Sequence, residues 1–323
     1  MNSQKSVLAV DVGGTKTIVA LILPTGKIIS RGYYLTLAEQ GTRAVINRLS
    51  SAINRSIAQA RLKDTEPMGI GIAVAGTLDT RRGIVTVSPN LPGWHNIPLR
   101  DVIAARSGLD TYLINDASAA ALGEYRFGAG RGFDNILYVT VSTGIGGGII
   151  INGELYSGTD GCAGELGHMT IEPDGPQCHC GNFGCLESLA SGWAIAKEAV
   201  TRINHGEASS ITELIDGRVE NITAQTVATA AKKGDGLARE IIAKAADYLG
   251  IGLANLVNIF NPELIIIGGG LSKMGNMLLE PARKVIKERA FRLPAQRVRV
   301  VRARLGSNAG ILGAAIHVAG VNL

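Results

Sequence analysis

Charged and aromatic residues are scarce in this sequence, and long apolar runs are missing. Acidic and basic residues together make up 18% of the 323 residues, and aromatic residues make up 4%. A hydrophobic content of 46% at so low a charge excludes an intrinsically disordered chain, which needs the opposite balance. No apolar run reaches membrane-spanning length without a charge or a glycine turn, and Met1 to Ser6 is too short and polar for a signal peptide. We therefore expect a cytoplasmic protein with no membrane partner.

Cysteine occurs four times in the chain, and its distribution favours a metal site. Three of the four cysteines lie between Cys178 and Cys185. In a reducing compartment, so close a group is more typical of metal binding than of disulfide bonds. The fourth, Cys162, lies outside the group and is expected to be a small packing residue.

Glycine is the residue in excess, with 42 copies, which is nearly twice its average frequency of about 7%. The glycines cluster in turns, where the backbone can approach another group closely, as in turns that hold phosphate groups. A chain of 323 residues also exceeds the usual size of one hydrophobic core. Two lobes are therefore expected, with a cleft for small ligands between them.

The pattern of apolar residues predicts an α/β protein in which one unit occurs twice. The apolar strand, glycine turn and returning strand of residues 7–22 recur 129 residues later, in residues 136–151. Two similarly built lobes explain this repeat, and two unrelated β-hairpins are the alternative. Further strands are expected at residues 27–34, 69–75, 112–114, 264–267 and 297–301, and helices at residues 43–62, 99–106, 117–125, 186–202, 223–233, 237–260, 277–289 and 309–318.

The first glycine turn carries an acidic residue at the end of a strand. Because this turn joins two strands, it is not the strand-to-helix phosphate loop of the P-loop enzymes or of the dinucleotide fold. Backbone N–H groups and the Thr15 hydroxyl can hold phosphate oxygens here, and Asp11 can orient a hydrated Mg²⁺ ion. A plain Gly-Gly hairpin turn is the alternative. The candidate phosphate-binding residues of this turn are Asp11, Gly13, Gly14, Thr15 and Lys16.

Two further glycine turns are candidates for binding the nucleotide. Thr143, Gly144 and Gly146 lie in the repeat of the first turn and can clasp the other side of a triphosphate. The segment Gly268-Gly269-Gly270 follows a buried strand and precedes a helix, which is a place where backbone can approach a nucleotide. A plain loop followed by a helix start is the alternative for this segment.

An Asn-Asp pair stands at the end of another apolar strand and opens a helix. Ligand-binding residues of α/β proteins occupy such positions, so Asn115 and Asp116 are candidates. If Asp116 faces a ligand, its carboxylate can accept a proton from a hydroxyl group whose oxygen attacks phosphorus. The alternative is that Asp116 only caps the helix.

A cluster of one histidine and three cysteines is the strongest local signal. His168, Cys178, Cys180 and Cys185 can supply the four ligands of a closed tetrahedral zinc site. His179 competes with His168 as the nitrogen ligand, but it would be strained between two ligand cysteines. Free cysteines in a turn are the alternative. Four protein ligands leave no open position for a substrate, so this zinc ion is expected to be structural.

Two carboxylates flank the cysteine cluster. Glu165 lies three residues before His168, and Glu187 lies two residues after Cys185. Charged acceptors on a loop that a metal holds rigid can bind sugar hydroxyl groups strongly. Either one can instead be a surface charge.

Taken together, these segments resemble the ROK family of sugar kinases, repressors and open reading frames. The resemblance covers nearly the whole chain: residues 141–168 match the glycine-rich signature of the family, and the cysteine cluster is highly specific to it. It implies an α/β, bilobal actin-like ATPase (ribonuclease H-like) fold with two lobes around a nucleotide and sugar cleft. We expect an N-terminal lobe of residues 1–117, on which a C-terminal helix of residues 308–323 packs, and a C-terminal lobe of residues 118–307 with the zinc site.

The same resemblance implies roles for the site residues. Asp116 would be the catalytic base, and ATP with Mg²⁺ would be the donor. Ser118 departs from the family pattern, since many members have a second asparagine there, and this puts only a minor hydrogen bond in doubt. Asn90 lies in a segment, residues 89–94, that resembles the one that closes over glucose in family glucokinases. The residues implied to touch the sugar are Asn90, Asn115, Asp116, Glu165, His168 and Glu187.

The activity that the resemblance implies is phosphorylation of the 6-hydroxyl of glucose, a reaction of glycolysis and carbohydrate metabolism. N-acetylmannosamine kinase, or another ROK hexose kinase such as fructokinase or allose kinase, is the alternative. The family's repressors need an N-terminal winged helix-turn-helix, and a first strand at about residue 6 leaves no room for one, so we expect no nucleic acid partner despite the net charge of +5. The preferred hexose and the choice between ATP and polyphosphate stay open, and a homodimer or homotetramer is expected.

Overall fold

The computed structural model describes residues 4–322, and in it the chain divides into two units. Unit 1 contains the residues up to Asp134, Gly148–Gly164 and the residues from Arg304 onwards, and unit 2 contains Asn135–Gly147 and Glu165–Ala303. The expected lobes divide the chain differently, because α3 (Asp116–Phe127) packs against α10 (Ala309–Asn322) and so belongs to unit 1. Residues 1–3 and 323 of the expected lobes lie outside the described residues.

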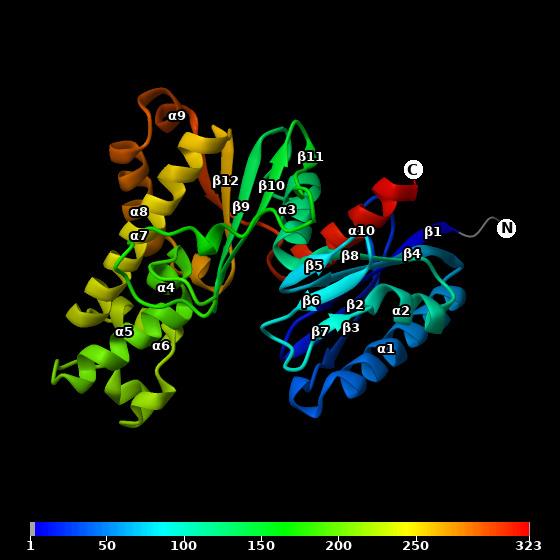
Figure 1. The fold of residues 1–323 in the computed structure, drawn as a ribbon, viewed down its shortest axis with the longest axis horizontal. Helices are drawn as coiled ribbons and strands as arrows, with labels where there is room; N and C mark the ends of the chain where they lie inside the picture. Colours follow the sequence, from blue (N-terminus) through cyan, green and yellow to red (C-terminus); the bar gives the residue numbers. More distant parts are fainter. Residues whose placement is uncertain (1–3, 323) are drawn as a thin grey trace. The chain divides into compact units, whose positions relative to one another are not determined.

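Unit 1 is built on a five-stranded sheet with the order β3-β2-β1-β4-β8. Residues 7–10 of β1 are buried on both faces of this sheet, which explains their uninterrupted apolar sequence. Figure 1 shows why: α1 (Thr42–Leu62) and α2 (Leu99–Ser107) lie on one side of the sheet, and α10 lies on the other. The strands are β1 (Gln4–Val12), β2 (Lys16–Ile22), β3 (Ile28–Leu35), β4 (Thr65–Val74) and β8 (Thr111–Asn115).

A small three-stranded sheet, which the sequence analysis did not predict, also belongs to unit 1. Its strands are β5 (Thr77–Asp79), β6 (Ile84–Val87) and β7 (His95–Ile97). Strands of three or four residues are too short to show an alternating pattern. The loop between β6 and β7 carries Asn90 and is anchored by Trp94, whose side chain is buried.

A second five-stranded sheet has the order β11-β10-β9-β12-β13 and matches the first sheet position by position. In each sheet the strand of the repeat, β1 or β9, lies between its hairpin partner and a parallel strand, β4 or β12. The predicted internal repeat is therefore a repeat of structure. The strands are β9 (Ile136–Val141), β10 (Ile145–Ile151), β11 (Glu154–Leu155), β12 (Leu264–Gly268) and β13 (Arg299–Arg302).

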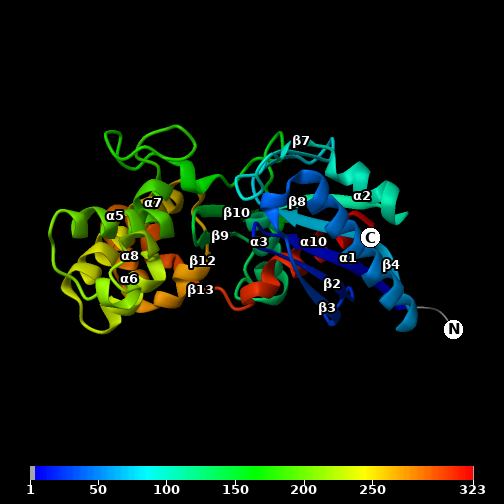
Figure 2. The same ribbon diagram turned by 90° about the horizontal axis from the view of Figure 1, so that it is seen from below.

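Apart from its strands, unit 2 is mainly helical. α7 packs against α8, and these helices lie side by side in both ribbon views (Figures 1 and 2). The helix predicted at residues 186–202 is interrupted at Ser191, whose side chain instead caps the next helix by accepting a hydrogen bond from the Ala194 N–H at 3.3 Å. The helices are α4 (Leu186–Ala190), α5 (Gly192–Asn204), α6 (Ala224–Lys232), α7 (Gly236–Phe260), α8 (Asn276–Arg289) and α9 (Arg292–Arg297).

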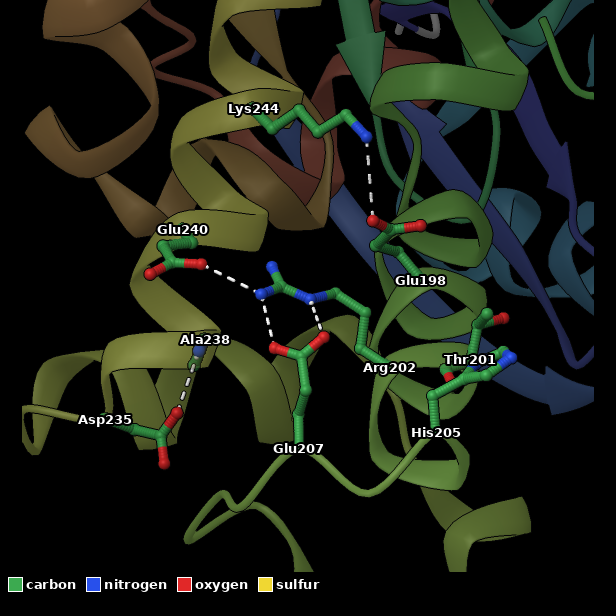
Figure 3. A network of polar contacts seen from close by, with 9 residues as sticks. All are labelled: Glu198, Thr201, Arg202, His205, Glu207, Asp235, Ala238, Glu240 and Lys244. Atoms are coloured by element: carbon green, nitrogen blue, oxygen red, sulfur yellow. Dashed lines mark hydrogen bonds and ion pairs between the residues drawn. The ribbon is translucent and has the colours of Figure 1, made fainter.

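Polar contacts fasten the C-terminal half of α5 to α7, as Figure 3 shows. The Arg202 guanidinium donates hydrogen bonds to Glu207 at 2.7 Å and to Glu240 of α7 at 3.0 Å. Lys244 of α7 lies 3.6 Å from Glu198 of α5. Several such contacts together hold one helix against the other better than one exposed ion pair does.

Short 3₁₀ helices complete the described chain. They are η1 (Ala38–Gln40), η2 (Leu166–His168), η3 (Thr212–Ile215), η4 (Val219–Asn221), η5 (Gly270–Met274) and η6 (Gly306–Asn308). In residues 4–322, no helix combines the length and the apolar character that crossing a bilayer requires.

Candidate functional site

Two aspartates of unit 1, Asp11 and Asp116, lie at the same edge of its sheet. β1 and β8 both run parallel to β4, so their carboxyl ends share that edge, where ligands of α/β proteins bind. Asp11 is the second-last residue of β1, and Asp116 is the first residue of α3, directly after β8. The structure thus brings together two of the acidic residues singled out in the sequence.

The cap of α3 is Asn115. Its side-chain oxygen accepts hydrogen bonds from the N–H groups of Ala117 at 2.9 Å and Ser118 at 3.1 Å, and its Nδ2 donates to the Gly76 carbonyl at 3.2 Å. Asp116 accepts a bond from the Ala117 N–H at 2.9 Å through Oδ1. The helix therefore has its cap without Asp116, whose second carboxylate oxygen makes none of these bonds.

Both aspartates are weaker acids than exposed carboxyl groups. Burial raises the pKa of Asp11 to about 6, and the neighbouring charge of Asp116 acts in the same direction, while Lys16 and Arg31 oppose it. Burial also raises the pKa of Asp116, against the opposing effect of the backbone N–H of Ala117. A carboxylate whose charged form is disfavoured accepts a proton more readily.

The first glycine turn lies against the segment that carries Asn90. A Cβ atom on Gly14 would lie 2.7 Å from the Asn90 carbonyl oxygen, so only glycine allows this approach. The turn itself closes with a hydrogen bond from the Gly13 N–H to the Lys16 carbonyl at 3.0 Å. Thr15 and Lys16 are exposed, and their polar groups are accessible to a ligand of unit 1.

The second glycine turn, in unit 2, lies against Glu187. The carboxylate of Glu187 accepts a hydrogen bond from the Ile145 N–H at 2.8 Å, and a Cβ atom on Gly144 would lie 2.3 Å from the same oxygen. Thr143 belongs to this turn, whereas Gly146 is a residue of β10. Glu187 is thus fixed to the turn as well as to the cysteine cluster that precedes it in sequence.

The third glycine segment begins at the end of β12 and packs on β9. Gly269 has a φ of 77°, and a Cβ atom on it would lie 2.3 Å from the Val141 carbonyl oxygen. A Cβ atom on Gly268 would lie 2.1 Å from the Tyr138 hydroxyl. Gly270 is less crowded and lines a pocket of about 510 Å³.

This pocket of unit 2 is lined by residues that sequence reasoning missed. Thr143 and Gly270 had been singled out, but the walls come from α5, α6 and η5, where no local signal marks a ligand site. Its size suits a drug-sized ligand or a nucleoside. The polar and aromatic residues that line it include Ser142, Trp193, Thr223, Gln225, Thr229, Lys232 and Lys273.

His168 and three cysteines form a cluster that can hold a metal ion. Their ligand atoms all lie within 4.8 Å of one another, with 3.7 Å between His168 Nδ1 and Cys178 Sγ and 3.7 Å between the Sγ atoms of Cys180 and Cys185. A tetrahedral site with metal–sulfur bonds of about 2.3 Å needs ligand atoms about 3.8 Å apart, so the residues fit such an ion. Burial raises the pKa of the Cys185 thiol to about 12, and a bound cation is what would stabilise its thiolate.

The neighbours of the cluster complete the arrangement expected around a metal. Nε2 of His168, opposite the cluster, lies 3.8 Å from a Glu165 oxygen, as in metal sites where a carboxylate orients the histidine. The Cys178 thiol lies 3.8 Å from the second Glu187 oxygen. His179 is not part of the cluster, and its ring stacks on Trp193 instead. Cys162 lies in unit 1, with its Sγ 3.6 Å from the Leu78 carbonyl.

Comparisons with known proteins extend these observations to the whole chain. The model of the ROK family matches residues 7–320. A glucokinase from Thermotoga maritima is 41% identical over 313 residues, which is 96% of each chain. The crystal structure of a ROK family glucokinase from Streptomyces griseus in complex with glucose and AMPPNP matches with a TM-score of 0.82 at 36% identity, over 97% of this chain and 98% of that one. A xylose repressor from Caldicellulosiruptor bescii is 35% identical over 308 residues, 95% of this chain and 76% of the repressor.

Proposed function

Because the chain belongs to the ROK family, we propose that it is a glucokinase, which transfers the γ-phosphate of ATP to the 6-hydroxyl of glucose. It has the bilobal actin-like fold of ROK sugar kinases. The observation that carries the proposal is the state of Asp116: it opens α3 at the edge of the sheet, Asn115 already caps the helix, and burial raises its pKa. Such a carboxylate is available as a base.

Asp116 is the proposed catalytic base. Its carboxylate accepts the proton of the 6-hydroxyl as that oxygen attacks the γ-phosphorus, and the P–O bond to the leaving ADP breaks. Its raised pKa favours proton acceptance, and a positioned base contributes about 10²- to 10⁴-fold to the rate. Asn115 holds the start of α3 in place, because its amide makes the cap bonds and the bond to Gly76.

The donor is proposed to lie with its nucleoside end in the pocket of unit 2. Gly270 and Thr143 bring backbone to this pocket, and Lys232 and Lys273 add positive charge suited to phosphate oxygens. The turn of unit 1 from Gly13 to Lys16 is the proposed partner of the terminal phosphates. Asp11 is the residue that would hold hydrated Mg²⁺, which supplies charge neutralisation of the phosphates when bound.

The sugar is proposed to contact Asn90, Asn115 and Asp116 from unit 1 and Glu165, His168 and Glu187 from unit 2. In unit 2, these contacts depend on the cysteine cluster, for which we propose a structural zinc ion held by His168, Cys178, Cys180 and Cys185. The carboxylate of Glu165 lies 3.8 Å from His168 Nε2, and the carboxylate of Glu187 lies 3.8 Å from Cys178 Sγ. We further propose a cytoplasmic protein of glycolysis that assembles as a homodimer or homotetramer.

A coupled assay that measures ADP release tests the proposed function. With ATP as donor, glucose should give the highest kcat/KM among glucose, mannose, fructose and N-acetylmannosamine. Polyphosphate releases no ADP, so transfer from polyphosphate is measured in parallel as the amount of sugar phosphate formed. The phosphorylated product should be glucose 6-phosphate. A higher kcat/KM for N-acetylmannosamine would replace the proposed substrate, and no transfer to any of the sugars would contradict a kinase.

A further inference from the structure

The indole ring of Trp193 joins the cysteine loop to the pocket of unit 2. Trp193 is the second residue of α5 and lines the pocket. Its ring stacks on the imidazole of His179, with 4.3 Å between the ring centroids and 30° between the planes. His179 lies between Cys178 and Cys180, two residues of the metal cluster. One stacking contact therefore separates the pocket wall from the cluster.

The backbone at the start of α5 is fixed independently of this stack. Gly192 donates a hydrogen bond to the Ser142 carbonyl at 2.8 Å, and Trp193 donates one to the Thr143 carbonyl at 3.2 Å. The other end of α5 is held to α7 by Arg202 and Glu198 (Figure 3). These backbone bonds do not fix the direction of the Trp193 side chain, because a large ring on a fixed backbone can still change rotamer.

Within residues 4–322, no hydrogen bond fixes the orientation of the indole ring. The ammonium group of Lys197 lies 5.8 Å from the ring centroid, and the Lys197 side chain is exposed. The indole N–H is buried and has no hydrogen-bond acceptor within the described residues 4–322. The ring is therefore not anchored by its polar end, and His179 is the aromatic side chain that packs on it.

We propose that His179 is a positioning residue for the nucleotide: its imidazole holds the Trp193 indole in the orientation that forms the pocket wall. The cysteine loop thereby supports donor binding through His179 as well as sugar binding through Glu187. The inference rests on the proposed function, since it takes the pocket of unit 2 to be the nucleotide site. An aromatic pair contributes about 0.5–1.5 kcal/mol beyond the area that it buries, which corresponds to about a two- to twelvefold change in affinity.

His179→Ala tests the inference, with His179→Phe as the conservative variant and Phe183→Ala as the control. Phe183 is an exposed aromatic residue of the same loop, two residues before Cys185, and it does not line the pocket. We expect His179→Ala to raise the KM for ATP and the Kd for ADP about two- to twelvefold. The KM for glucose, kcat and the metal content should stay unchanged. His179→Phe should restore nucleotide affinity, because a stacked ring and not an imidazole is required, and Phe183→Ala should change none of these values.

Tryptophan fluorescence gives a readout that needs no turnover. The chain has two tryptophans, Trp94 and Trp193, so the difference between the wild type and Trp193→Phe reports on Trp193. Removal of the metal with a chelator should shift the emission of Trp193 to longer wavelength in the wild type, because a loosened loop exposes the ring. In His179→Ala the metal-free and metal-loaded emissions should coincide.

The outcomes separate this inference from the proposed function. If the wild type binds no ADP, both the assignment of this pocket to the nucleotide and the inference about His179 are refuted. If the wild type binds ADP and His179→Ala binds it equally well, only the inference is refuted. An equal loss of glucose affinity in His179→Ala, or no recovery in His179→Phe, also refutes it, because a general disturbance of the loop would then explain the effect.

Discussion

Glu187 connects the second glycine turn to the cysteine cluster, so its replacement should disturb both. In Glu187→Ala the buried Ile145 N–H loses its acceptor, which lies at 2.8 Å. An unpaired buried donor costs about 1–3 kcal/mol. At about 2–4 °C per kcal/mol for a domain of this size, we expect Tm to fall by about 2–12 °C.

Glu187→Gln separates the charge of the side chain from its hydrogen bond. The amide oxygen still accepts a bond from the Ile145 N–H, so Tm should stay close to that of the wild type. The charged acceptor proposed for the sugar is lost, and a charged hydrogen bond is about twice as strong as a neutral one. A difference of about 1 kcal/mol predicts an increase of about fivefold in the KM for glucose.

Thermal unfolding followed by circular dichroism, together with initial rates at varied glucose, tests both variants. Glu198→Ala is the control, because Glu198 forms a partly exposed ion pair with Lys244 at 3.6 Å, and such pairs contribute only about 0–1 kcal/mol. If Glu187→Ala lowers Tm no more than Glu198→Ala does, the bond to Ile145 does not stabilise the turn. If Glu187→Gln leaves the KM for glucose unchanged, Glu187 does not bind the sugar through its charge.

Two further predictions concern the cysteine cluster and the buried carboxylate of unit 1. Purified protein should contain about one zinc ion per chain by elemental analysis, because four ligands close the site. Cys185→Ser should lower zinc content, Tm and glucose affinity together, because Cys185 caps α4, the helix that carries Glu187. Metal-free, fully active wild type would contradict this. The pKa of Asp11 is raised from 3.8 to about 6, so the folded state holds its proton more tightly than the unfolded state, and stability falls as the pH rises from about 4 to about 6. This prediction is tested by urea unfolding without nucleotide and Mg²⁺. The free energy of unfolding of Asp11→Asn, relative to that of the wild type, should rise by about 2 kcal/mol between pH 4 and pH 7. A difference that is independent of pH would show that Asp11 is not buried as described.

The regular elements of the fold were predictable because their sequence patterns are long. β1 is marked by an uninterrupted apolar run, and α7 is marked by many apolar residues at the helical period. The grouping of His168 with three cysteines was predictable for another reason: cysteines and histidines at short spacing have few other uses in a reducing compartment. The choice of His168 over His179 came from the geometry of short loops, and the structure places His168 among the cysteines.

What sequence reasoning missed depends on contacts between distant segments. The apolar pattern runs through Ser191, and only its extended backbone, with a ψ of 173°, separates α4 from α5. Trp193 lines the pocket because α5, α6 and η5 pack together, and Glu187 bonds to a residue 42 positions away. The sequence left open whether Asp116 caps α3, and the positions of hydrogen-bonding atoms were needed to assign the cap to Asn115.

The most direct test of the account is the Asp116→Asn variant, measured by turnover and by calorimetry with glucose. The amide keeps the shape of the side chain and can still bond a hydroxyl group, but it cannot accept the proton as the oxygen attacks phosphorus. We predict that kcat falls by about 10²-fold or more, while the Kd for glucose stays within about threefold of the wild type. Near-normal turnover in Asp116→Asn would contradict the account, because Asp116 would then not be the base, and the base would have to be sought at Glu165 or Glu187.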